Sequence, residues 1–319
     1  MYILNLDTRE KYTKFCKEFY NKEDSFLIVS TVKELKLLKR LLNIEQDLLK
    51  QCLNFNEDIK LDLFDNYDLL SVNSFEVENE DIVVEEINIF LADNFILVVC
   101  NESNFIYDTV KDIIMNNISM TEEISIVVLF KLNYLIFKSI ITHQFESLEK
   151  LEDLILKLED EMIEEAKKEQ LSKINDLRSK TRTGVKNKRP LLYIEDRIVK
   201  ENIRYLKYSD VKKYNLDNLQ GIDLGIEKLY NFAISTRELA DKLLDVYASK
   251  VSEKTNNLIT KLTILTGISL PITIITGIYG MNFRVMPWLN YEYAYPITLG
   301  VMVLILIVGI VILKVKDIL

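Results

Sequence analysis

Two long apolar runs near the carboxyl end restrict the possible folds of this chain more than any other feature. The first covers Leu262–Phe283 and the second Tyr293–Leu313, and neither contains a charged residue. At about 1.5 Å per residue, each run makes a helix about 32 Å long, enough to cross a hydrocarbon layer about 30 Å thick. Other apolar runs, such as Ile124–Phe130, soon meet a charge. The sequence therefore predicts a multi-pass protein of the cell membrane with transmembrane helices over 262–283 and 293–313.

Charged and aromatic residues near the two spans predict their orientation. Lysines flank the spans on the sides away from the connecting loop: Lys250, Lys254, Lys261, Lys314 and Lys316. The loop 284–292 holds only Arg284 and Glu292 as charges, and aromatic residues gather around it: Tyr279, Trp288, Tyr291, Tyr293 and Tyr295. Because cytoplasmic flanks carry the excess of lysine and arginine, we expect both termini, and the tail 314–319, in the cytoplasm. The loop 284–292 is then extracellular.

The first part of the chain has the pattern of a small α/β domain over 1–120. Branched and aromatic residues favour strands at Tyr2–Leu6, Phe26–Val29, Lys60–Phe64 and Ile87–Val99, and leucines at helical spacing favour a helix within Val32–Leu53. Acidic residues outnumber basic ones in the first half of the chain, and the reverse holds in the second half. This asymmetry favours a membrane or ion partner at one end.

A helical region is predicted over 121–215, followed by a stalk helix over 216–261 that runs into the first span. An apolar stripe and an opposite acidic face mark the helix near Leu151, and such a face is more often solvated than metal-sensing. The basic segment Arg178–Arg189 contains Gly184 and precedes Pro190, so we expect a turn there, which is either solvated or in contact with phospholipid heads or acidic neighbours. The predicted fold class is α+β with a membrane-spanning part.

Several function classes lack their sequence signals. The three cysteines Cys16, Cys52 and Cys100 form no CxxC pair, and His143 is the only histidine, so a soft-metal site is not expected. Neither a phosphate-binding glycine loop nor a G-x-S-x-G elbow occurs. With a net charge of −9, nucleic acid is not an expected partner. We expect no enzymatic activity and no organic cofactor.

Polar residues follow one side of the predicted stalk and first span. The stripe recurs at spacings of three and four: Asp245, Ala248, Ser252, Asn256, Ile259, Thr263, Thr266, Leu270, Thr273 and Gly277. A lipid-facing stripe has no need of so many hydroxyl and amide groups, so the pattern favours a pore wall made by like helices. Simple helix–helix packing is the alternative. Ile259 and Leu262 could form a hydrophobic constriction.

A short motif closes the first span. Its residues are Tyr279-Gly280-Met281-Asn282-Phe283. A glycine at a helix end permits a left-handed turn, and Asn282 then presents an amide on the helix axis. One asparagine makes no ion site, but several copies around a symmetry axis would make a ring of carbonyl oxygens.

The residues around this motif resemble the signature of CorA-type magnesium channels, members of the metal ion transporter superfamily with a GMN motif. The resemblance rests on residues 271–283, Leu243-Leu-Asp-Val-Tyr, Ser252-Glu-Lys-Thr-Asn256, Met286-Pro287 and Tyr295-Pro296. It implies a homopentamer whose first span lines the pore. Gly280, Met281 and Asn282 would form the selectivity filter, and Asn282 would hold Mg²⁺ through metal-bound water.

The same resemblance implies further roles along the helix. Asp245 and Asn256 would lie on the pore axis, with Asp245 as a second metal contact, and Leu270 and Thr273 would lie below the filter. Mg²⁺ would be the transported ion and a possible regulator. The partners would be other copies of the chain, the lipid bilayer and divalent cations.

Two alternatives to magnesium uptake remain open. The loop is less acidic than is usual for the family: Arg284 follows the motif, and Trp288 stands where an acid is common. The ion preference is therefore open. One alternative is a transporter of the same superfamily that carries Zn²⁺, or Co²⁺ or Ni²⁺. The other is a membrane-tethered coiled-coil scaffold without transport. The scaffold predicts that Asn282→Ala has no effect, whereas the channel predicts lost Mg²⁺ uptake.

Overall fold

The computed structural model describes residues 1–14, 23–39, 43–54, 59–78, 80–116, 125–200, 203–204, 219–282, 284, 286–287 and 291–315. Its internal contacts divide the chain into two units, Met1–Leu244 and Asp245–Leu319. Several residues used in the sequence predictions lie outside the described residues: Cys16, Phe283, Trp288, Lys316, and the segment ends at 120, 121, 215 and 216. The division into seven predicted segments stays a prediction.

The first unit is built on a seven-stranded mixed sheet. Its strands are β1 (Tyr2–Asn5), β2 (Lys11–Tyr12), β3 (Phe26–Ser30), β4 (Lys60–Leu63), β5 (Tyr67–Glu78), β6 (Asp81–Ala92) and β7 (Phe95–Val99). They lie in the order β2-β1-β3-β7-β6-β5-β4. Only the β3–β7 pair is parallel, with Phe26 opposite Phe95; the other neighbours are antiparallel, as in the β5–β6 hairpin that pairs Glu78 with Asp81.

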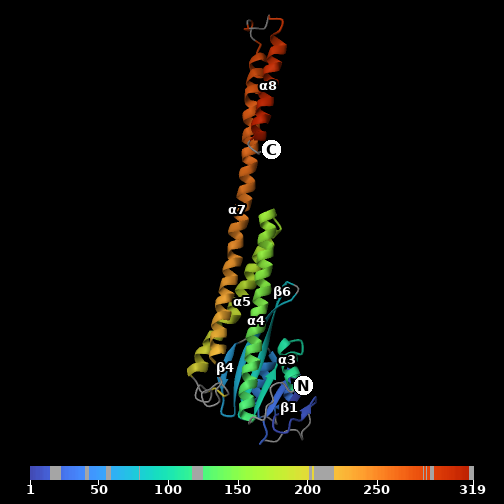
Figure 1. The fold of residues 1–319 in the computed structure, drawn as a ribbon, viewed down its shortest axis with the longest axis vertical. Helices are drawn as coiled ribbons and strands as arrows, with labels where there is room; N and C mark the ends of the chain where they lie inside the picture. The colour runs from blue at the N-terminus through green and yellow to red at the C-terminus, as the bar shows by residue number, and fades with distance from the viewer. Residues whose placement is uncertain are drawn as a thin grey trace. The chain divides into compact units, whose positions relative to one another are not determined.

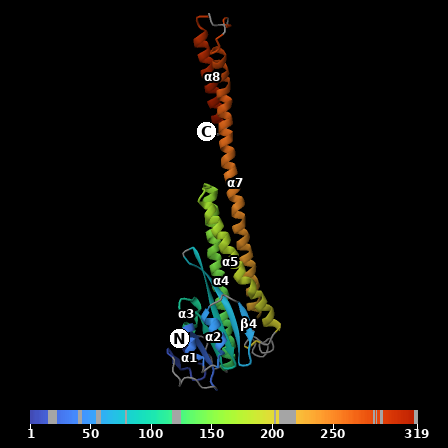
Figure 2. The ribbon, with the colours of Figure 1, turned by 180° about the vertical axis from the view of Figure 1, so that it is seen from behind.

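Helices cover both faces of this sheet (Figures 1 and 2). The first three are α1 (Val32–Leu38), α2 (Gln46–Asn54) and α3 (Phe105–Asn116). Side chains alternate between the faces of a strand. Phe26 and Ile28 of β3 therefore join α1 and α2 in one core cluster, together with Leu97 of β7. The unit is a layered α/β structure, in agreement with the predicted α/β domain.

Strand prediction from residue type succeeds for the short strands and fails at the hairpins. β1, β3 and β4 correspond to the predicted strands. The predicted strand Ile87–Val99 is wrong as a single element, because a turn at Asp93 and Asn94 separates β6 from β7. The predicted helix within Val32–Leu53 divides into α1 and α2, and neither the two-residue strand β2 nor β5 was predicted.

The helical part of the first unit consists of α4 (Ser125–Glu164), α5 (Gln170–Lys200) and the first part of α7 (Leu219–Tyr279). The predicted turn at 178–189 is wrong. The chain turns earlier, between Glu164 and Gln170, and α5 continues through Gly184 and Pro190. A β-carbon placed on Gly184 would lie 3.6 Å from both Leu148 and Phe75, so α5 packs closely on α4 and β5 there. This packing outweighs the low helix propensity of glycine and proline.

Within the first unit, α7 packs along an apolar seam. The buried positions recur at spacings of three and four, with one polar member, Thr236: Ile222, Ile226, Leu229, Ala233, Thr236, Ala240 and Leu243. The ring of Phe232 stacks on Phe145 of α4 at 5.9 Å between centroids. The Asp241 carboxylate accepts a hydrogen bond from the Arg178 guanidinium of α5 at 2.6 Å.

The second unit contains the rest of α7 and α8 (Ala294–Val315). Both helices are long and apolar enough to cross a membrane, within Leu224–Tyr279 and Ala294–Ile312. As predicted, the stalk runs into the first span as one helix, which continues through Pro271. It ends at Tyr279, however, so the motif residues Met281 and Asn282 follow the helix and do not belong to it.

Candidate functional site

All residues of the predicted pore stripe belong to α7 within the second unit. Every one of them is exposed in the single chain, including the apolar members Ile259 and Leu270, which are each 56% exposed. Leu262, the predicted partner of Ile259 in a constriction, is 64% exposed. A β-carbon on Gly277 would meet no atom within 4 Å. The stripe therefore has no packing partner among the described residues of its own chain.

A different face of α7 packs against α8. The less exposed residues of the span are all isoleucines, at positions 264, 268, 272 and 275. Their counterparts on α8 recur with the same helical spacing: Ala294, Thr298, Met302, Ile305 and Gly309. At about 100° per residue, the isoleucine face and the stripe centred near Leu270 lie about 180° apart. Thus α8 covers one side of α7 and leaves the polar side open.

Gly309 marks a close approach between the two helices. A β-carbon at this position would lie 2.7 Å from Cδ1 of Ile268, a distance at which atoms must move apart. A β-carbon at Gly300, on the opposite side of α8, would meet no atom within 4 Å. Small residues permit such close contact between membrane helices, so Gly309 fixes which side of α8 faces α7.

The hydroxyl groups of the span bond to their own helix. Thr263, Thr266 and Thr273 each donate to the backbone carbonyl four residues earlier, at 2.8, 2.8 and 2.9 Å. Each hydroxyl hydrogen is thereby used within the helix. The oxygen lone pairs remain free to accept hydrogen bonds from the open side of the stripe. The stripe can accept hydrogen bonds from water without supplying a formal charge.

The motif after α7 adopts a different turn from the predicted one. The Gly280 amide donates to the Thr276 carbonyl at 2.8 Å, and the Met281 amide donates to the Ile278 carbonyl at 3.2 Å. No glycine among the described residues has a positive φ, so the predicted left-handed turn at Gly280 is wrong. Gly280 is required for space instead, since a β-carbon would lie 3.0 Å from the Thr276 carbonyl oxygen. Asn282 follows a bend at Met281 and is exposed.

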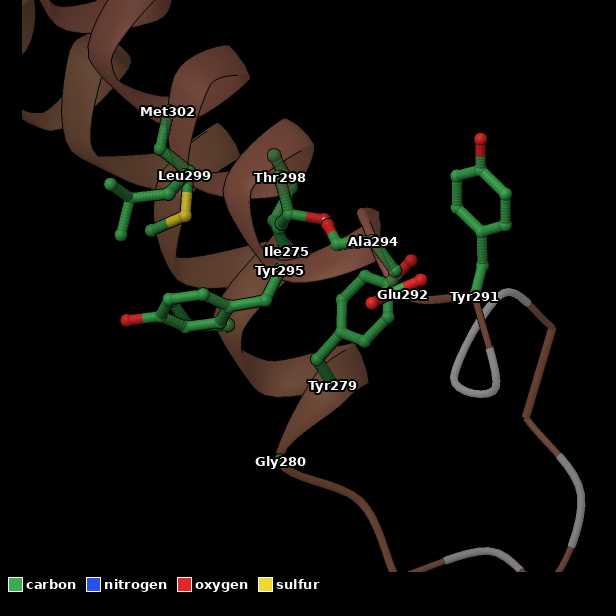
Figure 3. A pocket seen from close by; sticks show the side chains of 11 residues that line it. Ile275, Tyr279, Gly280, Tyr291, Glu292, Ala294, Tyr295, Thr298, Leu299 and Met302 are labelled. Carbon is green, nitrogen blue, oxygen red and sulfur yellow. The ribbon is translucent and has the colours of Figure 1, made fainter.

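The motif borders an apolar cavity of about 830 Å³ between the end of α7 and the start of α8 (Figure 3). Its walls include Tyr279, Gly280, Tyr291, Tyr295 and Met302, with Glu292 as the single acid. Tyr291 and Tyr293 form an edge-to-face ring pair at 6.0 Å. This cluster has the composition of an aromatic membrane-interface belt, as the sequence predicted for these tyrosines.

The predicted metal contacts Asn282 and Asp245 both lie exposed on the second unit, 37 positions apart in the chain. The described part of the chain contains no group of three or more His, Cys, Asp or Glu side chains that could hold a metal ion. A single chain therefore offers separate polar positions along one line and no closed ligand shell. Sequence reasoning identified this line, but it missed the isoleucine face of α7, whose regular spacing was the available signal.

Comparison with known proteins places these features in a family context. The model of a family described as CorA-like Mg²⁺ transporter protein matches residues 26–316. The chain is 28% identical over 281 residues to the cobalt/magnesium transport protein CorA of Thermotoga maritima, covering 84% of this chain and 75% of that protein. It is 24% identical to a putative metal ion transporter of Bacillus subtilis, covering 91% and 85%. The solved structure of the CorA magnesium transporter of Methanocaldococcus jannaschii has the same fold, with a TM-score of 0.75, 20% identity and coverage of 96% and 94%.

Proposed function

Since the chain belongs to the CorA-like Mg²⁺ transporter family, we propose that it is a passive channel that admits Mg²⁺ through the axis of a homopentamer. In this assembly the polar stripe of α7 lines the pore, and α8 lies outside it, toward the lipid. Both termini are in the cytoplasm, and the loop after Asn282 faces outward. The Gly280-Met281-Asn282 motif forms the entrance of the pore.

One observation carries this proposal: the polar stripe lies on the side of α7 opposite the isoleucines that face α8. If α7 packed on lipid at this side, its hydroxyl groups would bring no benefit. If several copies of α7 meet there, the same groups surround a wet axis. The exposure of Leu270 and Ile259 on the same line is consistent with apolar rings that alternate with polar ones.

The chemistry of the stripe suits a cation that keeps its water. Mg²⁺ loses its hydration shell reluctantly, so a neutral oxygen that accepts hydrogen bonds from that shell can hold it without stripping it. A ring of Asn282 amides supplies such oxygens, whereas a ring of carboxylates would bind a dication too tightly for it to leave. The membrane potential drives entry, at about 4.6 kcal/mol for a dication at 100 mV.

The test is Mg²⁺ flux into vesicles that contain the purified full chain and a trapped Mg²⁺ indicator, with an inside-negative potential. We expect Asn282→Ala to reduce flux to the level of empty vesicles, while the oligomer size by light scattering stays unchanged. The matched control is Asn257→Ala, which removes the same amide from an exposed position beside the stripe residue Asn256. Normal flux in Asn282→Ala would instead support the scaffold alternative.

Ion choice is tested with the same vesicles. Replacing external Mg²⁺ by Co²⁺, Ni²⁺ or Zn²⁺ ranks the ions that the wild-type chain admits. Because Asn282 offers an oxygen to bound water and no soft ligand, we expect Mg²⁺ to pass and Zn²⁺ to be poorly conducted. Faster Zn²⁺ than Mg²⁺ flux would favour the zinc-transporter alternative.

A further inference from the structure

A basic cavity lies within the first unit, between α5 and α7, and the proposed channel activity does not use it. Its volume is about 410 Å³, and it is lined by Arg182, Val185, Lys186, Arg189, Pro190 and Arg237. The two helices lie side by side in both views of the fold (Figures 1 and 2), and the Arg178–Asp241 ion pair joins them at 2.6 Å. Four of the six lining residues are cations and none is an acid.

The cations of this cavity differ from the other cations of α5. Lys173 pairs with Glu161 at 3.8 Å, Arg178 with Asp241, and Lys180 with Asp176 at 2.5 Å. In contrast, Arg182, Lys186 and Arg189 have no ion pair among the described residues. These three unpaired cations all line the cavity. The other cation of this segment without an ion pair is the buried Lys188, which contacts the Phe75 ring.

The placement of these residues follows from the uninterrupted course of α5. Positions 182, 186 and 189 are separated by four and three residues, so a continuous helix brings them to one face. Buried residues of the same segment, including Thr181 and Gly184, occupy the other face. Had the chain turned at 178–189, as its sequence predicts, these side chains would not form one surface.

Arg237 of α7 completes the cavity from the other side. Its Nε atom is buried and has no hydrogen-bond partner within the described structure. A buried charged donor without an acceptor is costly, and four cations around one space repel one another. An anion bound in the cavity would relieve both costs.

We propose that this cavity binds a soluble oligophosphate, of the class to which nucleoside triphosphates belong. Arg182 to Arg189 extends about 10 Å along the helix axis, which exceeds the size of a single phosphate group. Arginine forks match phosphate oxygens in pairs, and three of the four cations are arginines. Val185 and Pro190 provide an apolar wall for the uncharged part of the ligand.

The absence of an acid in the lining predicts which form of the ligand binds. A Mg²⁺ ion bound to an oligophosphate neutralises two of its charges and finds no carboxylate in this cavity. The metal-free anion should therefore bind more tightly than its Mg²⁺ complex. This preference would distinguish the cavity from a site that recognises the metal.

The test is isothermal titration calorimetry on the full chain in nanodiscs of neutral lipid, with tripolyphosphate, ATP and inorganic phosphate as probes. We expect tripolyphosphate and ATP to bind once per chain, inorganic phosphate to bind more weakly, and added Mg²⁺ to weaken the binding of ATP. The double variant Arg182→Gln/Arg189→Gln should lose at least about tenfold in affinity, as expected when charge-assisted hydrogen bonds are removed. Both side chains are exposed, so folding should be unaffected.

Lys173→Gln is the matched control, because it removes one positive charge from an exposed position of α5 outside the cavity. Its affinity should stay within about twofold of the wild type by the small effect of a screened surface charge. The proposal is overturned if no probe binds, if the double variant binds as well as the wild type, or if Lys173→Gln loses as much affinity. It is also overturned if nanodiscs with phosphatidylglycerol abolish probe binding, since a lipid headgroup would then be the occupant.

Discussion

The two units use the same apolar residue types in opposite ways. In the first unit, leucine and isoleucine side chains are hidden between the sheet and its helices, as with Leu151, which has no exposed area. In the second unit, Leu265 and Ile278 are 61% and 55% exposed. The difference shows that the first unit forms its own core, whereas the second relies on surroundings that the single chain does not supply.

Polar groups follow the same division. In the first unit, some helix hydroxyls such as that of Thr236 bond within their own turn, but side chains of the sheet also bond to distant parts of the chain. The Ser71 hydroxyl donates to the Asn88 side chain at 2.5 Å, and the Asn104 amide donates to the Ser74 hydroxyl at 2.8 Å. In the second unit, hydroxyl groups bond to the backbone of their own turn. Long-range bonds hold a fold together, whereas bonds within one turn leave the helix surface free for other contacts.

The largest expected effect tests whether the open side of α7 is a pore. Gly277→Leu should reduce Mg²⁺ flux to background, because side chains from several copies would meet at a narrow axis. In the single chain a β-carbon at this position meets no atom within 4 Å, so we expect the fold of each chain to be unaffected. Gly300→Leu on α8 is the control, since that position also has open space and lies on the side away from α7. Equal flux in both variants would contradict the pore assignment.

Leucine truncation tests the contrast between the two environments directly. Leu151→Ala should lower the free energy of unfolding of the first unit by about 2–5 kcal/mol, from lost burial and a new cavity. Leu265→Ala should cost less than about 1 kcal/mol, because lipid contacts the leucine before and after unfolding within the membrane. Thermal unfolding of the full chain in detergent compares the two. Similar costs would mean that Leu265 has a protein environment.

The contact at Gly309 sharpens the comparison within the second unit. Gly309→Leu must displace Ile268, and we expect a loss of about 1–3 kcal/mol from overpacking. The measurement is the resistance of the full chain to unfolding in increasing concentrations of denaturing detergent. Gly300→Leu should be nearly neutral in this measurement. If both leucines are tolerated, α7 and α8 do not pack through Gly309.

An effect no larger than that at Gly309 is expected from a buried amine in the first unit. Lys188 is 1% exposed and its Nζ has no hydrogen-bond partner among the described residues; it lies 4.0 Å from the centre of the Phe75 ring. Burial lowers the pKa of this amine well below 10.5. The ring contact favours the charged form by only about 2 kcal/mol, less than the cost of burying an ammonium group, which is several kcal/mol.

Lys188→Met should therefore stabilise the first unit by about 1–3 kcal/mol at neutral pH. Because the unfolded chain binds a proton that the folded chain lacks, wild-type stability rises with pH from the lowered pKa of the folded state up to about 10.5. The advantage of the methionine variant should shrink as the pH rises through this window. Thermal melts at several pH values measure it, and a constant advantage would mean that the amine is charged in the folded chain.

Much of the second unit could be predicted from sequence because the bilayer imposes its thickness. The length of Leu262–Phe283 alone indicates a span, and hydroxyl residues at positions such as Thr266 and Thr273 mark one face of it. The face toward α8 could not be predicted in the same way. The regular spacing of its isoleucines marks a face, but these residues are as apolar as lipid-facing ones, so only the contact with Gly309 identifies this face as the one toward α8.

In the first unit, prediction failed where packing outweighs local preference. Gly184 and Pro190 indicate a turn when considered alone, but the contacts of Gly184 with Leu148 and Phe75 hold the helix intact. That error also concealed the basic cavity, because Arg182 and Arg189 share a face only on an unbroken helix. The β5–β6 hairpin pairs residues from Glu78 with Asp81 to Tyr67 with Ala92, and the periodicity within each strand does not indicate this partner.

The back-bonded threonines of α7 give the stripe a polarity that no single residue type indicates. Since each hydroxyl hydrogen bonds to the helix, the hydroxyl oxygens accept hydrogen bonds from water, and water molecules turn their hydrogens toward the wall. Water bound to a cation also turns its hydrogens outward. Water around an anion has the opposite orientation. In the proposed assembly, such a wall would discriminate by sign of charge while carrying none itself. Neither threonine nor asparagine titrates in the physiological range, so this discrimination would persist unchanged when the cell interior acidifies.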